Sequence, residues 1–184
     1  CIRDRGREVG YAIIAVGTIG IIIAIYKLIE LAGVARAVKN QASSKAADPR
    51  NPLGRVLKVG QDNFEKDIDT LELKLAEAIM AERPAIERWI GAVRIISVVA
   101  PLAGLLGTVT GMIVTFQMIT LYGTGDPKLM AGGISQALVT TVLGLLVAIP
   151  TTLLHSFTAS SARGIISTLE EQSTGILAEH SEAK

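Results

Sequence analysis

Residues 129–162 have the sequence LMAGGISQALVTTVLGLLVAIPTTLLHSFTASSA, in which His155 is the only ionisable side chain. A second uncharged stretch covers residues 95–125. A membrane-spanning helix needs about 20 mainly apolar residues to cross about 30 Å of hydrocarbon, and both stretches are long enough. Their glycines, serines and threonines let helices pack closely, and hydroxyl groups can line a narrow path. These residues therefore predict two membrane spans that pack tightly and conduct.

A third predicted span covers residues 9–26, which contain no charged side chain. As a helix, this segment has a length of about 27 Å, with Tyr11 and Tyr26 placed as interfacial anchors. A cleaved signal peptide is the alternative, but its apolar core is shorter than this one. The chain begins with Cys1 rather than Met, which suggests that upstream residues were removed or not included; a lipidated Cys1 is another interpretation.

The composition agrees with a membrane protein, because 49% of the residues are hydrophobic, 19% are charged and the net charge is +1. A nucleic-acid partner is not expected, since such surfaces combine clustered basic residues with aromatic ones, and the chain has only 7 aromatic residues. We expect no enzyme and no metal site, because no nucleophile, base and orienting group occur together and no metal-ligand spacing is present. The single cysteine excludes an internal disulfide.

The distribution of lysine and arginine predicts the orientation. Residues 27–94 hold 12 of the 18, whereas residues 121–133 hold only Lys128. Cytoplasmic loops carry an excess of basic residues, so we expect the N-terminus in the periplasm and the C-terminus in the cytoplasm. The arginines within residues 1–8 favour the opposite orientation, but they are fewer.

The fold class that follows is an all-α membrane protein with three transmembrane helices and long cytoplasmic helical extensions. Its segments are an N-terminal periplasmic stub (1–8), transmembrane helix 1 (9–26), a cytoplasmic helical region (27–94), transmembrane helix 2 (95–121), a periplasmic loop (122–133), transmembrane helix 3 (134–157) and a cytoplasmic C-terminal helix (158–184). Within the cytoplasmic region, apolar residues at helical spacing over residues 57–79 predict one helical stripe. Pro84 is expected to start the next helix, which would run through Trp89 into the second span.

Two motifs resemble the MotA/TolQ/ExbB family of ion-driven motor subunits. Residues 100–112 have the sequence APLAGLLGTVTGM, and residues 132–150 have the sequence GGISQALVTTVLGLLVAIP. Together they match the second and third spans at nearly every position. The layout of three spans with the N-terminus outside is similar to the ExbB and TolQ branch, whereas a flagellar MotA is expected to have four spans.

The resemblance implies a pentameric helical barrel in a bacterial inner membrane, formed around a pore. In this family the second and third spans surround two single-span helices of an ExbD-like or TolR-like partner, whose membrane aspartate binds the proton. Protons are then the coupling ion, no cofactor is expected, and a TonB-like protein energising outer-membrane transport is the expected client. A TolQ-like subunit of the envelope-constriction system and a non-conducting membrane scaffold are the alternatives.

The resemblance also assigns roles to individual residues. Thr108 and Thr141 match the pore threonines that face the partner's aspartate, and Thr140 is placed with them on the proton pathway. Gln136 departs from the family, because classical ExbB has a glutamate there; it is interpreted as a group that orients water or holds the partner helix, with helix packing as the alternative. The alternatives for each threonine are a hydrogen bond to a carbonyl of its own helix and packing between helices. Close helix packing is the role predicted for Gly104, Gly107, Gly111 and Gly144.

Overall fold

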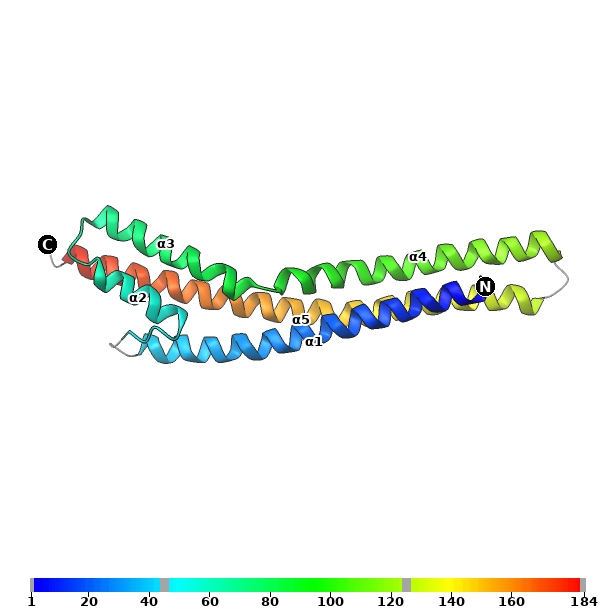
Figure 1. Cartoon of the computed structure of the whole chain (residues 1–184), viewed down its shortest axis with the longest axis horizontal. Coiled ribbons are helices and arrows are strands. Elements are labelled where there is room, and N and C mark those ends of the chain that lie inside the picture. The colour runs from blue at the N-terminus through cyan, green and yellow to red at the C-terminus, as the bar shows by residue number, and fades with distance from the viewer. Residues whose placement is uncertain (1, 44–46, 124–126, 183–184) are drawn as a thin grey trace. The chain divides into compact units, whose positions relative to one another are not determined.

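The computed structural model describes residues 2–43, 47–123 and 127–182. Five helices make up most of them: α1 (Ile2–Ala42), α2 (Pro52–Asp62), α3 (Ile68–Glu87), α4 (Ile90–Tyr122) and α5 (Pro127–Glu182) (Figure 1). No strand occurs within these three ranges, and the all-α prediction is confirmed.

The chain forms two compact units. The membrane unit consists of Cys1–Ile25 and Trp89–Ser156, and the polar unit consists of Tyr26–Arg88 and Phe157–Lys184. Helices α1 and α5 each continue from one unit into the other. The polar unit therefore contains the C-terminal parts of these two helices, together with α2 and α3.

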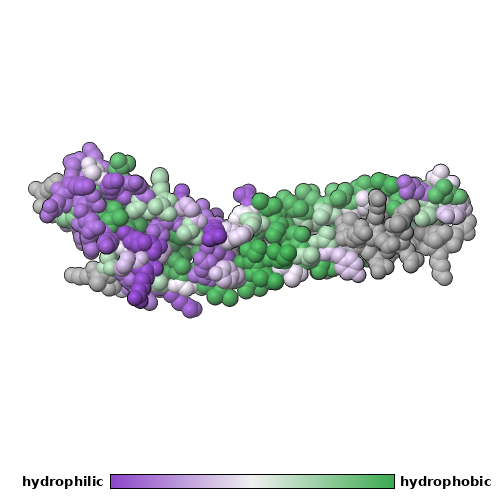
Figure 2. Space-filling view, in the orientation of Figure 1, coloured by the Kyte–Doolittle hydropathy of each residue, from purple (hydrophilic) through white to green (hydrophobic). Residues whose placement is uncertain are grey.

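Three helices are long and apolar enough to cross a membrane, over Gly10–Ala42, Ile90–Tyr122 and Met130–Glu182. Their number agrees with the three predicted spans. Their large apolar side chains are exposed in the single chain, as Leu106 and Leu146 illustrate with 57% and 62% exposure. Figure 2 shows apolar residues gathered over α4 and hydrophilic residues over α2 and α3. Such exposed apolar surface is suited to lipid or to neighbouring helices.

The helices extend further than the predicted spans. Helix α5 begins at Pro127, where proline is favoured because its fixed φ suits the first turn and its missing N–H has no helical partner. Residues 127–133 of the loop predicted over residues 122–133 are helical. The same helix continues without interruption past residue 157 to Glu182, and α1 continues past residue 26 to Ala42.

The prediction of one helix from Pro84 through Trp89 is wrong. Helix α3 contains Pro84 and ends at Glu87, and α4 starts at Ile90. Between them, Trp89 has φ 69 and ψ −14, a left-handed conformation, and it is the only non-glycine residue with positive φ in the described chain. The Cβ atom disfavours the left-handed region for every residue except glycine. A tryptophan at this position therefore gives no sequence signal that one helix ends and another begins.

This conformation leads to a test. We expect Trp89→Gly to be more stable than Trp89→Ala by about 1 kcal/mol, because both variants lose the indole and only alanine keeps the Cβ strain. Thermal unfolding of the two variants in the same detergent measures the difference. An alanine variant at least as stable as the glycine variant would contradict the left-handed conformation at this position.

The polar unit corrects a second prediction, since the stripe over residues 57–79 does not lie on one helix. Leu71 and Leu75 are buried as expected, at 0% and 1% exposure. The chain leaves the helix after Asp62, however, where the Asn63 side chain donates a hydrogen bond of 2.7 Å to the Val59 carbonyl. Such a side-chain bond satisfies a carbonyl left free at the helix end. The stripe is therefore divided between α2 and α3.

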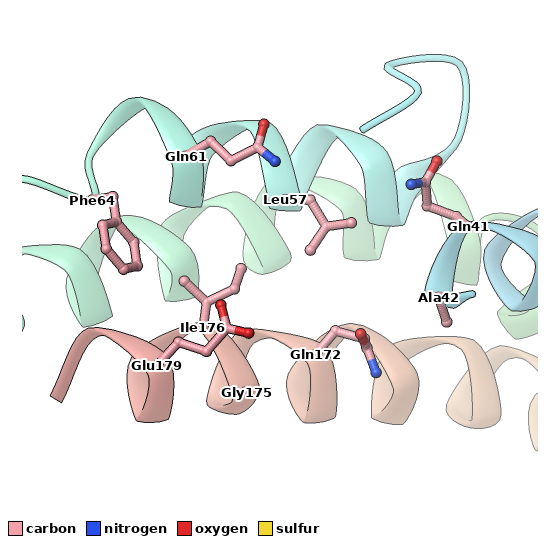
Figure 3. Close-up of a pocket in the computed structure, with 9 residues that line it drawn as sticks. All are labelled: Gln41, Ala42, Leu57, Gln61, Phe64, Gln172, Gly175, Ile176 and Glu179. Atoms are coloured by element: carbon pink, nitrogen blue, oxygen red, sulfur yellow. The ribbon is translucent and has the colours of Figure 1, made fainter. Parts of the chain in front are cut away.

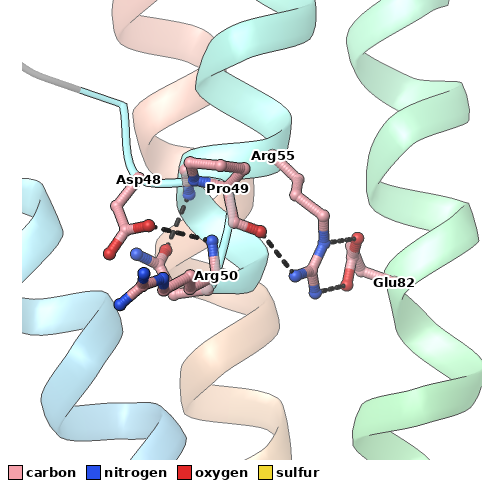
Figure 4. Close-up of polar contacts among 7 residues, drawn as sticks. Asp48, Pro49, Arg50, Arg55 and Glu82 are labelled. Carbon is pink, nitrogen blue, oxygen red and sulfur yellow. Dashed lines mark hydrogen bonds and ion pairs between the residues drawn. The ribbon is translucent and has the colours of Figure 1, made fainter.

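Polar contacts fix the start of α2 and join it to α3 (Figure 4). The Asn51 side chain accepts a hydrogen bond of 2.7 Å from the Gly54 N–H and thereby caps α2. The Arg55 guanidinium donates to both carboxylate oxygens of Glu82 at 2.6 and 2.7 Å and to the Pro49 carbonyl at 3.0 Å. The hydrogen bonds to Glu82 raise the pKa of Arg55 above its ordinary value. This bidentate pair holds α2 and α3 in register.

Candidate channel-lining surface

Helices α4 and α5 approach each other most closely along a line of glycines, here called the seam. A Cβ atom on Gly104 would lie 3.0 Å from the Thr140 carbonyl oxygen, and one on Gly144 would lie 2.7 Å from the Ala100 carbonyl oxygen. A Cβ on Gly111 would lie 2.7 Å from the Ala137 Cβ. A Cβ on Gly107 would likewise collide with the Thr140 side chain. All four glycines singled out from the sequence thus lie where the facing helix leaves no space for a side chain.

Helix α1 packs on one edge of the seam, here called the covered edge. A Cβ on Gly17 would lie 2.5 Å from Val147 of α5, and a Cβ on Gly20 would lie 2.9 Å from Ile96 of α4. At the other end of the contact, a Cβ on Gly10 would lie 3.5 Å from Leu143 of α5. Ile96 of α4 and Leu143 and Val147 of α5 therefore face α1. The direction of any other residue of α4 or α5 follows from its rotation around the helix relative to these three.

Thr108 and Thr141 lie on the opposite edge of the seam, here called the open edge. Successive residues of a helix are rotated by about 100°, so Thr141 lies about 120° around α5 from Val147. Thr108 lies about 120° around α4 from Ile96 by the same geometry. In both helices a glycine of the seam lies between the two positions. The structure thus brings both threonines to the edge of the seam that α1 does not occupy, and both are half-buried.

The hydroxyl groups of this pair have different partners. Thr141 Oγ1 donates across the seam to the Gly104 carbonyl at 3.4 Å, which is a long and weak hydrogen bond. Thr108 Oγ1 donates to the Leu105 carbonyl of its own helix at 2.7 Å. A hydroxyl has one donor and two acceptor positions, so each can still accept a hydrogen bond. Both groups can therefore interact with a polar group that approaches the open edge.

Thr140, the third threonine assigned to the proton pathway, lies between α4 and α5. Thr140 is 2% exposed, its side chain faces Gly107, and its hydroxyl donates to the Ala137 carbonyl at 2.7 Å. This residue lies inside the seam, where its side chain fills the space that the glycine leaves. In this structure Thr140 packs between helices, and it does not line the open edge.

Gln136 is also separated from the threonine pair. It lies five residues before Thr141 and hence about 140° around α5 from it, whereas it lies only about 20° from Leu143. Leu143 faces Gly10 of α1, so Gln136 is on the covered edge. Gln136 is therefore turned toward the covered edge and away from Thr141.

Four other threonines of the membrane unit bond to their own helices. Donation to a carbonyl three or four residues earlier is observed for Thr110, Thr115, Thr151 and Thr152. These bonds satisfy the hydroxyls without any ligand. Residues 95–125 and 129–162 contain no aspartate and no glutamate. No group of three metal-ligating side chains occurs among the described residues.

Sequence reasoning missed a buried charge in the polar unit. Lys27 is 2% exposed, and its ammonium donates to the Glu30 carboxylate at 3.2 Å and to the Ala85 carbonyl at 3.1 Å. The second bond satisfies a carbonyl near the C-terminal end of α3. The only signal in the sequence was the position of Lys27 directly after an uncharged span, which indicates an interfacial lysine and not a helix cap.

The match to a protein family agrees with this arrangement. Residues 48–171, more than half of the chain, match the model of the MotA/TolQ/ExbB proton channel family. The chain belongs to this family. A MotA/TolQ/ExbB protein with three long apolar helices is a multi-pass membrane protein, and the matched residues include the whole of the seam.

Several relatives with ExbB names match this chain. An ExbB homologue from Methanothermobacter thermautotrophicus, named as a biopolymer transport protein, is 32% identical over 172 residues, which are 83% of this chain and 60% of the relative. The biopolymer transport protein ExbB of Aquifex aeolicus is 45% identical over 64 residues, 35% of this chain and 43% of the relative. The ExbB of Salmonella typhimurium is 27% identical over 121 residues, 66% of this chain and 50% of the relative. The chain thus spans about 60% or less of the length of these relatives.

Proposed function

We propose that this chain is the channel-forming subunit of a proton-driven motor in the inner membrane, and that the open edge of its α4–α5 seam lines the proton path. The observation that carries the proposal is the placement of Thr108 and Thr141 together on the edge opposite α1. Membership of a proton channel family supports the ion. The ExbB names of the relatives support a role in biopolymer transport.

The chemistry of the open edge suits a proton carrier supplied in trans. A threonine hydroxyl donates a hydrogen bond to an ionised carboxylate and accepts one from a protonated carboxylic acid. Thr108 and Thr141 therefore accommodate both states without titrating. A single-span partner of the ExbD or TolR type, with an aspartate at this level of the membrane, supplies the group that titrates. The membrane potential contributes about 2.3 kcal/mol per proton per 100 mV, which is enough to drive conformational work over several protons.

The assembly we propose is a pentamer around two copies of the single-span partner, with the N-terminus in the periplasm and the polar unit in the cytoplasm. Its client is a TonB-like protein that energises transport across the outer membrane. Three features support a barrel: the exposed apolar surface of the membrane unit, the open edge, and the absence of a carboxylate from the two spans that form the seam. The ExbB names favour this client over the envelope-constriction system served by TolQ-like subunits.

Native mass spectrometry of the complex tests the composition directly. The complex is purified through this chain from its own membrane in a mild detergent. We expect five copies of the chain with two copies of a small protein that has one membrane span and an aspartate within it. A chain that remains a monomer, or an oligomer that carries no second protein, would overturn the proposal and favour a scaffold.

A further inference from the structure

The junction between α3 and α4 is broken at a residue that does not favour a break. Proline and glycine are the residues that commonly interrupt helices, but Pro84 lies inside α3 and Gly91 lies inside α4. A proline ring clashes with the carbonyl four residues earlier and allows the residues after it to continue the helix. The break falls at Trp89, in a left-handed conformation that is costly for an aromatic residue. A contact from elsewhere in the chain is therefore needed to hold it.

The side chain of Lys27 on α1 supplies such a contact. It is buried, and its ammonium donates a hydrogen bond of 3.1 Å to the Ala85 carbonyl. In an uninterrupted helix this carbonyl accepts a hydrogen bond from the N–H four residues later, at Trp89. Helix α3 ends at Glu87, and the ammonium provides a donor for the carbonyl from another helix. Glu30 compensates the buried charge at 3.2 Å. Lys27 thus satisfies a polar group at the end of α3.

We propose that the junction has two states and that Lys27 selects the broken one. In the second state α3 and α4 form one helix, in which Trp89 loses its left-handed strain and Ala85 gains a helical donor. A contact that is made in only one of two states shifts the equilibrium toward that state, and the Lys27 bond is made only in the broken one. The junction gives the polar unit a means of acting on α4, the helix that carries Thr108.

The first turn of α4 is where the two states differ most. The first N–H groups of a helix have no acceptor within that helix. No side chain caps α4, and the Val93 N–H donates to the Trp89 carbonyl at 3.2 Å. In one continuous helix the N–H groups of residues 90–92 donate to the carbonyls of residues 86–88. These N–H groups therefore exchange with deuterium slowly in the continuous state and fast in the broken state.

Hydrogen–deuterium exchange of the full chain in lipid nanodiscs tests the junction. Lys27→Met keeps an apolar side chain of similar length and removes the donor. We expect residues 90–92 to exchange about tenfold more slowly than in the parent chain, the factor that corresponds to relief of left-handed strain at one residue. A lysine that only stabilises the polar unit predicts the opposite sign, because its loss loosens the structure and speeds exchange.

Equal or faster exchange in a folded Lys27→Met chain would overturn the proposal. A chain that fails to fold without the lysine would overturn it as well, because both states of the junction are folded.

Substitutions of Trp89 add a readout that depends on the strain itself. Trp89→Gly removes the strain and also disfavours a helix, so the broken state no longer needs the lysine. Trp89→Ala keeps the strain of the broken state and favours a helix. We therefore expect Lys27→Met to slow exchange in the Trp89→Ala chain and to leave it fast in the Trp89→Gly chain. The same exchange rate in both double variants would count against the proposal.

The matched control is Lys58→Met, the same substitution on α2. Lys58 is exposed and has no ion-pair partner among the described residues. It lies next to Leu57, which lines a groove of about 500 Å³ (Figure 3). The residues that line this groove belong to α1, α2, α5 and the turn after α2. The control is therefore distant from the junction in the contacts it makes, and we expect parent-like exchange. Equal slowing in the control would show that the Lys27 contact is not the cause.

The action of the junction on α4 rests on the proposed function. We expect Lys27→Met to lower the partner-dependent proton flux severalfold and Trp89→Gly in the same chain to restore it. Parent-like flux in a Lys27→Met complex whose exchange has slowed would overturn this action. Absence of flux from the parent complex would instead refute the proposed function, and the exchange experiment would still decide whether the junction has two states.

Discussion

Thr141→Val abolishes most of the partner-dependent proton flux, if the open edge lines the path. Valine has nearly the same shape as threonine, with a methyl group in place of the hydroxyl. We therefore expect the packing of α4 against α5 to be kept. A hydrogen bond to a charged group contributes about 1.5–3 kcal/mol, which corresponds to about a tenfold to hundredfold lower flux. We expect Thr108→Val to act in the same direction. Flux is measured with a pH-sensitive dye in proteoliposomes that contain the chain and its single-span partner.

Two variants show whether the hydroxyl itself is responsible. Thr141→Ser keeps the donor and acceptor and should retain most of the flux. Thr110→Val removes a hydroxyl that bonds to carbonyls of its own helix, and it should have little effect. Unchanged flux in Thr141→Val, with the complex intact, would remove the conducting role of the open edge and favour the scaffold interpretation. A serine variant as inactive as the valine variant would point to packing instead.

Gly144→Val is expected to prevent stable assembly. A Cβ at this position lies 2.7 Å from a backbone oxygen of Ala100, and a backbone cannot rotate away as a flexible side chain can. Helices α4 and α5 must then move apart, which widens the seam and opens the edge where Thr141 lies. Overpacking of this kind costs about 1–3 kcal/mol even for small insertions, so we expect Gly144→Ala to lower the melting temperature by several degrees and Gly144→Val to lower it further.

The matched control for the seam is Gly132, another glycine of α5. A Cβ on Gly132 would have no atom within 4 Å, so Gly132→Ala and Gly132→Val should leave the melting temperature close to that of the parent chain. Thermal unfolding and size-exclusion chromatography in detergent report on all four variants. Equal effects at the two positions would contradict the close approach of the helices at Gly144.

Much of the fold follows from the sequence because a long uncharged apolar run satisfies its backbone hydrogen bonds in lipid by forming a helix. The runs over residues 95–125 and 129–162 predict α4 and the apolar part of α5, and the glycine pattern places the seam between them. The breaks in the polar region were harder to predict. Trp89 adopts a left-handed conformation that favours glycine, and α2 ends at Asp62 without a proline or glycine to mark the end.

The candidate site was predictable only in part, because the sequence does not show which way each residue of a helix faces. Thr108 and Thr141 match a family motif, but only the contacts of α1 show which edge of the seam they share. Gln136 and Thr140 lie within five residues of Thr141, and the sequence grouped them with it. Rotation around the helix turns Gln136 to the covered edge and Thr140 into the seam. The groove of the polar unit depends on tertiary packing, and no local pattern indicates it.

The measurement that tests the open edge most directly is cross-linking between α5 and the single-span partner. Thr141→Cys or Val142→Cys, each in the Cys1→Ser background, is combined with a cysteine placed one turn from the partner's membrane aspartate. Val142 is 55% exposed and lies about 100° around the helix from Thr141, farther from the seam. We predict a disulfide with position 141 and none with position 142. A disulfide with position 142 alone, or with neither position in an intact complex, would contradict the placement of the proton path along the open edge.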